Sequence, residues 1–360
     1  MFSGKHLTIA ARLLHKARIL LWIPGFFLLW TAAGCGPKRK NAVEPAFYYW
    51  KTNFRMGGYE QRTLQQTGSK TLYIRLFDVD WDERQQQPRP VGLLQPSPVQ
   101  DTTLTCIPVV FITQRCLARL QEKDLPVLAS RITQLMAELC KGLQIKPPEI
   151  QIDCDWTKQR ADLYFALLRQ IKAQAFVQDK KMSCTIRMHQ VKYTASSGIP
   201  PVDRGLLMVY NMGNLKKYGP ANSILDLKDA KDYMKNIGQY PLPLDVALPF
   251  YHWGVLFIRQ NFGGLVYNVS EDDFKKGDLV RIKGDLYLVP KPVEAAGYSF
   301  KPGTEIRFEH PDRDMLLDIA SYIRPRINDS AFRLAYFHLD SFALRRFSIT
   351  DMNAIREAFQ

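Results

Sequence analysis

The sequence lacks the cysteine and histidine spacings that bind metals. Its six cysteines include no Cys-x-x-Cys pair and its six histidines no His-x-x-x-His pair, which are typical of zinc sites. No Gly-x-Gly-x-x-Gly follows any expected strand, which disfavours a dinucleotide site. Internal repeats and low-complexity tracts are also missing. We therefore expect neither a metal nor another cofactor.

Acidic residues are missing from the first 34 residues. An apolar stretch over 19–30 follows a basic lead and precedes small residues at 32–34. This order is typical of an export signal. Pro24-Gly25 interrupts the apolar stretch, which is too short for a membrane span of about 20 residues. We predict a signal peptide over residues 1–34. The basic residues of the lead are Lys5, Arg12, Lys16 and Arg18.

Cys35 ends a segment, Ala32-Ala33-Gly34-Cys35, that resembles the lipobox of bacterial lipoproteins. Ala32 departs from it, since Leu is usual there. The resemblance implies that Cys35 carries lipid, with palmitate among the acyl chains, and becomes the mature N-terminus. Ordinary secretion and an uncleaved anchor are the alternatives. We expect attachment to a membrane of the bacterial cell envelope on its periplasmic side, with surface exposure left open.

The mature chain of about 325 residues can bury one large core or two modest ones. Subtracting the four basic residues of the leader from the net charge of +14 leaves +10. Exported proteins rarely meet nucleic acid, so we expect no such partner. The basic charge could instead attract anionic membranes, acidic cell-wall polymers or acidic glycans. The simpler explanation is that scattered lysines keep the protein soluble. Lys38-Arg39-Lys40 suits anionic headgroups. The sequence does not predict the oligomeric state.

From residue 46 onward, apolar strands alternate with amphipathic helices. About eight alternations are typical of an α/β fold of the (β/α)8 TIM-type barrel class, and a doubly wound open sheet is the alternative. We predict a linker over 35–45 and a barrel over 46–360, with a small β-rich insertion over 254–301 after the seventh strand. The predicted strands are 46–50, 71–81, 106–112, 149–156, 183–191, 205–212, 244–251 and 331–340. The predicted helices are 124–142, with Gly142 as the stop, 163–171, 224–236 and 311–324, and 82–103 is predicted to be a long exposed loop.

The run Gln151–Thr157 carries the strongest indication of function. It is a buried strand that ends in two carboxylates and an indole. A buried carboxylate is costly unless something pairs with it or uses it. Asp153 and Asp155 are two residues apart, so they share one face of the strand, roughly 7 Å apart along it. Paired acids at a strand end are one way to build a sugar-cleaving site.

The chemistry of a barrel sits at the C-terminal ends of its strands. Aromatic and acidic residues alternate there, which suits a sugar, because rings stack on its faces and acids bond its hydroxyls. Each residue also has a simpler explanation. Trp50 and Trp253 can cap the barrel, and Arg187 can neutralise either aspartate. The candidate residues are Trp50, Asp78, Asp80, Asp153, Asp155, Trp156, Arg187, His189, Gln190, Tyr210, Asn211, Tyr251, Trp253, His338 and Asp340.

Several of these strand ends resemble motifs of the chitinase-like glycoside hydrolases of family 18. Asp153–Thr157 is similar to their D-x-D-W-E segment, and Met208–Asn211 to their M-x-Y-D. Ala247–Tyr251 is similar to their G-x-P-F-Y, which can precede an inserted subdomain. Phe337–Asp340 resembles their last strand, where a Trp is usual. The chain also resembles bacterial lipoproteins with barrel folds through Ile150–Trp156 and Pro200–Gly205.

Two departures from the family motifs affect the chemistry. The motif's final Glu is the family's proton donor, and Thr157 stands in its place. A threonine hydroxyl cannot protonate a glycosidic oxygen near neutral pH, and Thr157 suits the N-cap of the following helix. Asn211 replaces the family's Asp. If the family's mechanism operates, another acid must donate the proton, and Asp78, Asp80 and Asp340 are the candidates. Otherwise Asp155 is the donor, its pKa raised by Asp153 and by burial.

Three hypotheses follow. The first is an O-glycoside hydrolase with Asp155 as acid, Asp153 orienting or buffering it, and Tyr210 near the reacting carbon. The second is a catalytically silent, lipid-tethered barrel that binds a glycan or cell-wall fragment through the aromatic rim. The third is a structural or assembly lipoprotein whose rim contacts protein. The sequence alone does not choose between an enzyme and a binding protein.

Overall fold

A computed structural model describes residues 42–360 of the protein. The predicted signal peptide over 1–34, the lipidation site Cys35, the basic cluster 38–40 and most of the 35–45 linker lie outside these residues. Among residues 42–360, no helix combines the length and the apolar character that a membrane crossing requires.

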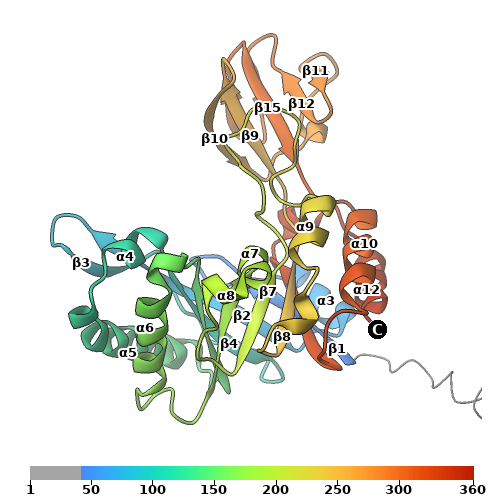
Figure 1. Ribbon diagram of the computed structural model, residues 1–360. Helices are drawn as coiled ribbons and strands as arrows, with labels where there is room; N and C mark the ends of the chain where they lie inside the picture. The colour runs from blue at the N-terminus through green and yellow to red at the C-terminus, as the bar shows by residue number, and fades with distance from the viewer. Residues whose placement is uncertain (1–41) are drawn as a thin grey trace, which may run out of the picture. The chain divides into compact units, whose positions relative to one another are not determined.

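Eight parallel strands form a closed ring, because the first strand pairs with both the second and the last. The ring and its outer helices confirm the predicted (β/α)8 TIM-type barrel (Figure 1). Each ring strand neighbours the next one along the chain. In that order the ring strands are β1 (Ala42–Tyr49), β2 (Thr71–Asp82), β4 (Thr105–Ile112), β5 (Glu149–Cys154), β6 (Lys181–Arg187), β7 (Arg204–Met208), β8 (Leu244–Pro249) and β16 (Ala331–Phe337).

Helices cover the outside of the ring with their apolar faces inward. In α6 (Ala161–Lys172), for example, Tyr164, Leu167, Leu168 and Ile171 are buried at helical spacing, which buries one stripe of the helix against the sheet. The other helices are α3 (Gly58–Thr67), α4 (Gln114–Arg119), α5 (Leu125–Leu143), α7 (Met188–Lys192), α8 (Thr194–Ser197), α9 (Leu227–Tyr233), α10 (Arg313–Ile323), α11 (Ser341–Leu344) and α12 (Ile349–Ala358).

The structure corrects three details of the predicted elements. Gly142 does not stop α5, which ends at Leu143 because Gln144 adopts the left-handed conformation at φ 56°. The strand predicted over 183–191 ends at Arg187, where α7 begins. The expected loop over 82–103 contains β3 (Gln87–Val91), which pairs antiparallel with the end of β2 outside the ring.

A β-rich insertion follows β8. Its five-stranded sheet runs in the order β10-β9-β15-β12-β11, next to a two-stranded hairpin. The insertion stands on the barrel (Figure 1) and has a small apolar core of its own. The last strand of the insertion ends at Glu309, and the chain then continues into the barrel. The strands are β9 (Trp253–Ile258), β10 (Asn261–Tyr267), β11 (Val280–Lys283), β12 (Leu286–Leu288), β13 (Val293–Ala295), β14 (Tyr298–Phe300) and β15 (Thr304–Glu309).

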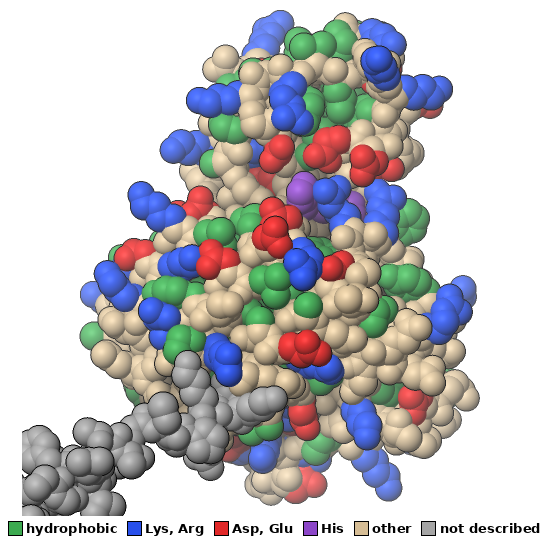
Figure 2. All heavy atoms as spheres, turned by 90° about the vertical axis from the view of Figure 1, so that its right-hand side faces the viewer, with side chains coloured by type: hydrophobic (Ala, Val, Ile, Leu, Met, Phe, Trp, Pro, Cys, Tyr) green, Lys and Arg blue, Asp and Glu red, His purple; other side chains and the backbone are tan. Residues whose placement is uncertain are grey.

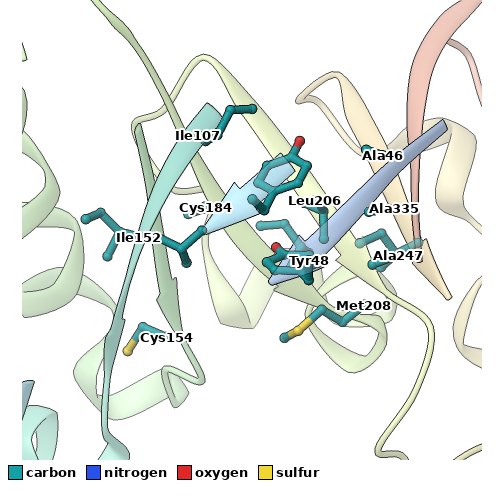
Figure 3. Close-up of a cluster of buried hydrophobic side chains, with 14 of the residues drawn as sticks. Ala46, Tyr48, Ile107, Ile152, Cys154, Cys184, Leu206, Met208, Ala247 and Ala335 are labelled. Atoms are coloured by element: carbon teal, nitrogen blue, oxygen red, sulfur yellow. The ribbon is translucent and has the colours of Figure 1, made fainter. Parts of the chain in front are cut away.

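The interior of the ring is filled by side chains in layers. Tyr48 lies there near Leu206, Met208 and Ala247 (Figure 3). The Tyr48 ring stacks on Tyr73 with centroids 4.9 Å apart. Small residues therefore make room for large aromatic ones, as in other packed barrel cores.

An ion cluster closes the N-terminal end of the ring. Arg333 bonds Glu149 at 2.8 Å, and Arg204 bonds Asp245 at 2.9 Å. Burial raises the pKa of Asp245 to about 6, although both arginines act to lower it. This polar cluster lies opposite the strand ends that carry the candidate site.

The outer surface carries both signs of charge. On the face in Figure 2, lysines and arginines are interspersed with aspartates and glutamates. This arrangement fits the simpler explanation of the basic net charge, a solvated surface without a dominant patch on that face.

Candidate functional site

The end of β5 directs alternate side chains into the ring. Because strand residues alternate between faces, the face that carries buried Gln151 also carries Asp153. Asp155 follows one residue beyond the end of β5 at Cys154, and its charge acts on Asp153. Gln151 accepts a hydrogen bond from the Tyr48 hydroxyl of β1, and Asp153 accepts one from Thr185 of β6 at 2.6 Å. The two predicted acids therefore stand together at the C-terminal end of the barrel.

Asp155 is neutralised by an arginine of the neighbouring strand. Arg187, the last residue of β6, approaches it through Nε at 2.7 Å and Nη2 at 3.0 Å. Both side chains are about one-fifth exposed, at 22% and 19%. The Nη2 contact is a charge-assisted hydrogen bond to Oδ2, and the Nε contact brings the guanidinium against Oδ1.

Asp153 has a different environment. It is 9% exposed. Burial and the charge of Asp155 raise the pKa of Asp153 to about 7, although the bond from Thr185 acts to lower it. Near neutral pH this group therefore exists in both protonation states. Among residues 42–360 its carboxylate forms no ion pair.

The other candidate carboxylates all have cationic partners. Arg75 pairs with Asp78 at 2.6 Å, and Lys51 with Asp340 at 2.8 Å. Asp80 accepts hydrogen bonds from Arg115 at 3.0 Å and Thr113 at 2.7 Å. These contacts tie Asp80 to α4, and the Arg115 guanidinium holds the pKa of Asp80 well below its usual range.

Asp340 also caps α11 through the backbone N–H groups of Phe342 and Ala343. Burial acts to raise the pKa of Asp340, but Lys51 and the backbone bond together lower it. Asp78, Asp80 and Asp340 are thus engaged in structural contacts, which makes them poor replacements for a proton donor.

Trp156 is not part of the site. Its ring is 2% exposed and stacks on Tyr164 of α6, with centroids 5.1 Å apart. Its Nε1 donates to the Ser197 carbonyl at 2.9 Å. Trp156 follows the end of β5 at Cys154 and is buried against α6, so its ring has almost no surface left for a substrate.

Aromatic rings form a continuous series from the ring mouth to the insertion. The centroid separations are 6.0 Å for Tyr210–Tyr251, 5.3 Å for Tyr251–Trp253 and 6.3 Å for Trp253–Tyr267. Burial raises the pKa of both Tyr210 and Tyr251, so their phenols stay neutral. The Tyr251 hydroxyl donates to Asn211 at 2.5 Å. The structure thus brings these four predicted residues together and adds Tyr267.

Trp50 lies on the other side of Phe337, which also contacts Tyr210 and Tyr251. Its ring contacts Tyr48 and Phe337, with centroids 5.9 and 5.6 Å away, and the Arg75 guanidinium lies 5.7 Å from its centroid. Trp50 is only partly buried. It therefore keeps surface for a ligand in addition to its packing role.

The remaining predicted residues differ in availability. Gln190 is fully buried and bonds the Arg187 backbone N–H and the Trp156 carbonyl, so its role is structural. His189 is exposed, and partial desolvation of its imidazole together with Arg187 lowers its pKa. Burial lowers the pKa of His338 to about 4. Both imidazoles are therefore neutral near pH 7.

Thr157 is exposed at the start of the chain segment after β5. It occupies the N-cap position of a short 3-10 turn (Lys158–Arg160), as predicted, but its hydroxyl makes no capping hydrogen bond in the described part of the chain. Only its carbonyl accepts a bond, from the Arg160 backbone N–H at 3.0 Å.

Sequence reasoning missed three polar residues of this region. Thr185 bonds Asp153, Arg75 pairs with Asp78, and Glu309 accepts from the Trp253 indole at 2.8 Å. Alternation along β6 could have revealed Thr185, which is two residues from Arg187. Alternation along β2 could not have revealed Arg75, because a β-bulge between Arg75 and Phe77 brings it to the face of Asp78. Nothing local signals Glu309, which is 56 residues from Trp253.

Residues 42–360 contain no group of three or more His, Cys, Asp and Glu side chains arranged to hold a metal. The cysteines at 106, 116, 140, 154 and 184 are free and buried. Burial raises the pKa of each of these thiols. They are therefore inert packing groups at neutral pH rather than nucleophiles.

No family model matches the chain, and no curated protein matches it. Solved structures share the fold. The C-terminal domain of a chitinase candidate from Desulfitobacterium hafniense has a TM-score of 0.54 at 10% identity, covering 89% of this chain and 100% of that one. A GH18 chitinase from Cycas revoluta in complex with (GlcNAc)3 has a TM-score of 0.53 at 11% identity, covering 88% and 99%.

The spore cortex-lytic enzyme SleL of Bacillus megaterium is also similar, with a TM-score of 0.50 at 12% identity, covering 88% of this chain and 75% of SleL. The distant resemblance to chitinase-like barrels is thus confirmed at the level of fold. At these identities the likeness concerns the fold alone.

Proposed function

We propose that this protein is a glycan-binding barrel that has lost the hydrolytic step of its chitinase-like structural neighbours. The ligand lies across the C-terminal rim of the barrel, between Trp50 and the series Tyr210, Tyr251 and Trp253. Trp50 and Trp253 are partly buried, whereas Tyr210 and Tyr251 are buried behind them. Indole faces that keep some exposure, beside hydroxyl and amide groups, suit a sugar, whose faces are apolar and whose edges are polar.

One observation supports binding over hydrolysis most strongly. Asp155, the predicted donor, is held in an ion pair with Arg187, so its oxygens face a guanidinium and are not free to approach a glycosidic oxygen. Thr157, which the resemblance aligns with the family's Glu, carries a hydroxyl that cannot act as an acid near neutral pH. Asp78, Asp80 and Asp340 are engaged as well.

Asp153 supports a second candidate, a weak glycoside hydrolase. Its pKa of about 7 is suited to a general acid at neutral pH. Its depth and its bond from Thr185 count against this role, because a donor must come within about 3 Å of the glycosidic oxygen. If Asp153 is the acid, turnover will disappear in Asp153→Asn.

The ligand that we would test first is a chitooligosaccharide, because the Cycas revoluta neighbour was solved with (GlcNAc)3. Peptidoglycan fragments and other glycans form the wider panel. Isothermal titration of the protein with (GlcNAc)3 should show binding. Trp253→Ala should weaken it about tenfold or more, since a stacked ring contributes on the order of 1–3 kcal/mol.

Phe176→Ala is the matched control. Phe176 is a partly buried aromatic residue on the connection from α6 to β6, at the opposite end of the barrel. It should leave affinity unchanged. A complete lack of binding across the panel would instead favour a structural role in which the rim contacts protein.

We further propose that the barrel is exported and tethered to a bacterial membrane through lipid on Cys35. The support is the order of basic, apolar and small residues before that cysteine. A lipid anchor would hold the glycan-binding rim close to the cell envelope, where cell-wall glycans are found.

A further inference from the structure

A buried ion pair joins the insertion to the candidate glycan site. Arg307 and Glu309, both on β15, are each 1% exposed and bond at 2.5 Å. Burying two charges is costly, and an apolar pair of similar size is often as stable. The pair therefore calls for an explanation beyond the stability of the insertion's sheet.

Arg307 binds the backbone of a distant loop. Its guanidinium donates to the carbonyls of Leu215, Lys217 and Gly219 at 3.1, 2.7 and 2.9 Å. These residues lie in the 209–226 connection between β7 and α9, which contains no helix or strand among the described residues. Connections of this length in compact domains are mostly functional or disordered, and here one side chain orders the middle of the loop.

Glu309 acts at the two edges of the same region. Its Oε2 accepts from Ser223 near the end of the loop at 2.5 Å and from the Trp253 indole at 2.8 Å. Trp253 belongs to the aromatic series of the rim. The same carboxylate thus fixes a ring of the candidate site and the loop beside it.

The loop also contributes directly to the rim. Asn211, at its start, accepts from Tyr251, and its backbone N–H bonds the Ile224 carbonyl at 2.8 Å, which closes the loop base. Further along, Leu215 and Tyr218 pack against Val255 and Phe257 of the insertion. Hydrogen bonds and apolar packing therefore join the loop to both the insertion and the rim.

We propose that Arg307 and Glu309 are positioning residues: they hold the 209–226 loop and the Trp253 ring as one wall of the glycan site, so that glycan affinity depends on this buried pair. The proposal rests on the proposed function, because it concerns the same site. It adds that buried residues of the insertion, and not only residues on its surface, affect ligand binding.

Limited trypsin digestion tests how the loop is held without any glycan. Lys216 and Lys217 are exposed, yet the Lys217 carbonyl, which a protease must polarise, is bound by Arg307. In the full-length protein, Arg307→Met should increase the rate of cleavage after these lysines about tenfold or more, because the loop opens more often once three charge-assisted bonds are lost. Cleavage after Lys275 and Lys276, exposed elsewhere in the insertion, is the internal control and should not change.

Titration with (GlcNAc)3 completes the test. Arg307→Met should weaken binding about tenfold, whereas Arg281→Met, which changes an arginine paired with Tyr287 on the same insertion, should not. Should Arg307→Met fail to fold, Arg307→Lys keeps the charge opposite Glu309 but cannot reach three carbonyls at once. It should change both readouts in the same direction.

The possible results separate the two proposals. Unchanged cleavage after Lys216 and Lys217 overturns the positioning role, as does faster cleavage with unaltered glycan affinity. If the unmodified protein binds no glycan, the proposed function fails, and the cleavage rates alone then decide whether Arg307 holds the loop.

Discussion

Asp153 is a buried acid whose surroundings oppose its ionisation. The side chain is buried, accepts one bond from Thr185 and lies beside the negative charge of Asp155. Its ionisation is therefore costly. In the folded protein the acid is retained at the expense of stability at high pH.

The stability of the protein should therefore respond to Asp153→Asn in a pH-dependent way. The folded pKa of about 7 lies above the unfolded value of 3.8. An acid whose pKa is raised by folding costs no stability below about pH 4, where it is protonated in both states. The cost grows as the pH rises through 7, because the folded protein must then carry the buried charge. We expect the variant to gain on the order of 4 kcal/mol at pH 8, with no gain at pH 4. Denaturant unfolding at both pH values measures it.

Asp155→Asn is the informative contrast, because it removes the partner of Arg187 and leaves that guanidinium unpaired. We expect it to destabilise the protein at both pH values. Equal stabilisation by the two substitutions would contradict the different environments described for the two acids.

At the scale of elements, sequence patterns predicted most of the barrel but less of its periphery. Strand alternation and helical stripes depend on local burial, which the sequence records directly. The end of β6 at Arg187 and the pairing of β3 depend on contacts with distant segments. The burial of Trp156 against Tyr164 of α6 likewise depends on packing between segments beyond the end of β5.

The junction between insertion and barrel should be sensitive to acid. His252, 3% exposed, has no hydrogen-bond partner for either ring nitrogen among residues 42–360. Burial, then Arg345, Arg346 and His310, lower its pKa to about 4, while Asp273 acts to raise it. A base with a depressed pKa contributes its full stability above the unfolded value of 6.5, and this is lost as the pH falls towards 4.

His252→Leu should remove this sensitivity. It deletes two unpartnered buried nitrogens at similar volume, so we expect thermal stability unchanged at pH 7.5 and a melting temperature several degrees above the unmodified protein at pH 4.5. Calorimetry at the two pH values checks this. An identical acid-induced loss in both proteins would show that His252 does not control the junction.

For the molecule as a whole, the tether is the feature most open to direct test. Membrane association should depend on Cys35, since lipid on that residue is the proposed anchor. We expect Cys35→Ser to move the protein from the membrane fraction to the soluble fraction after cell disruption, with Cys106→Ser, a buried barrel thiol, as the control that stays bound. Retention of Cys35→Ser in the membrane would exclude lipid on Cys35 as the anchor.

The fold of the whole molecule was predictable because eight alternations leave few architectures. The candidate site was only partly predictable from the sequence. The order of motifs located the rim, whereas the pairing of its carboxylates with Arg75, Arg115, Arg187 and Lys51 required three dimensions. Arg115, Arg187 and Lys51 come from other segments of the chain than the acids they contact, and Arg75 faces Asp78 only because of the bulge in β2.

The most direct test of a glycan-binding barrel without hydrolysis is product analysis after binding has been established. The protein is incubated with (GlcNAc)4 at a concentration that saturates the site, and the sugars are separated and quantified over time. The account predicts that the tetrasaccharide is bound and recovered intact at pH 5 and pH 7. Shorter products formed at a rate that Asp153→Asn abolishes would contradict it, and would identify Asp153 as the acid of an active glycosidase.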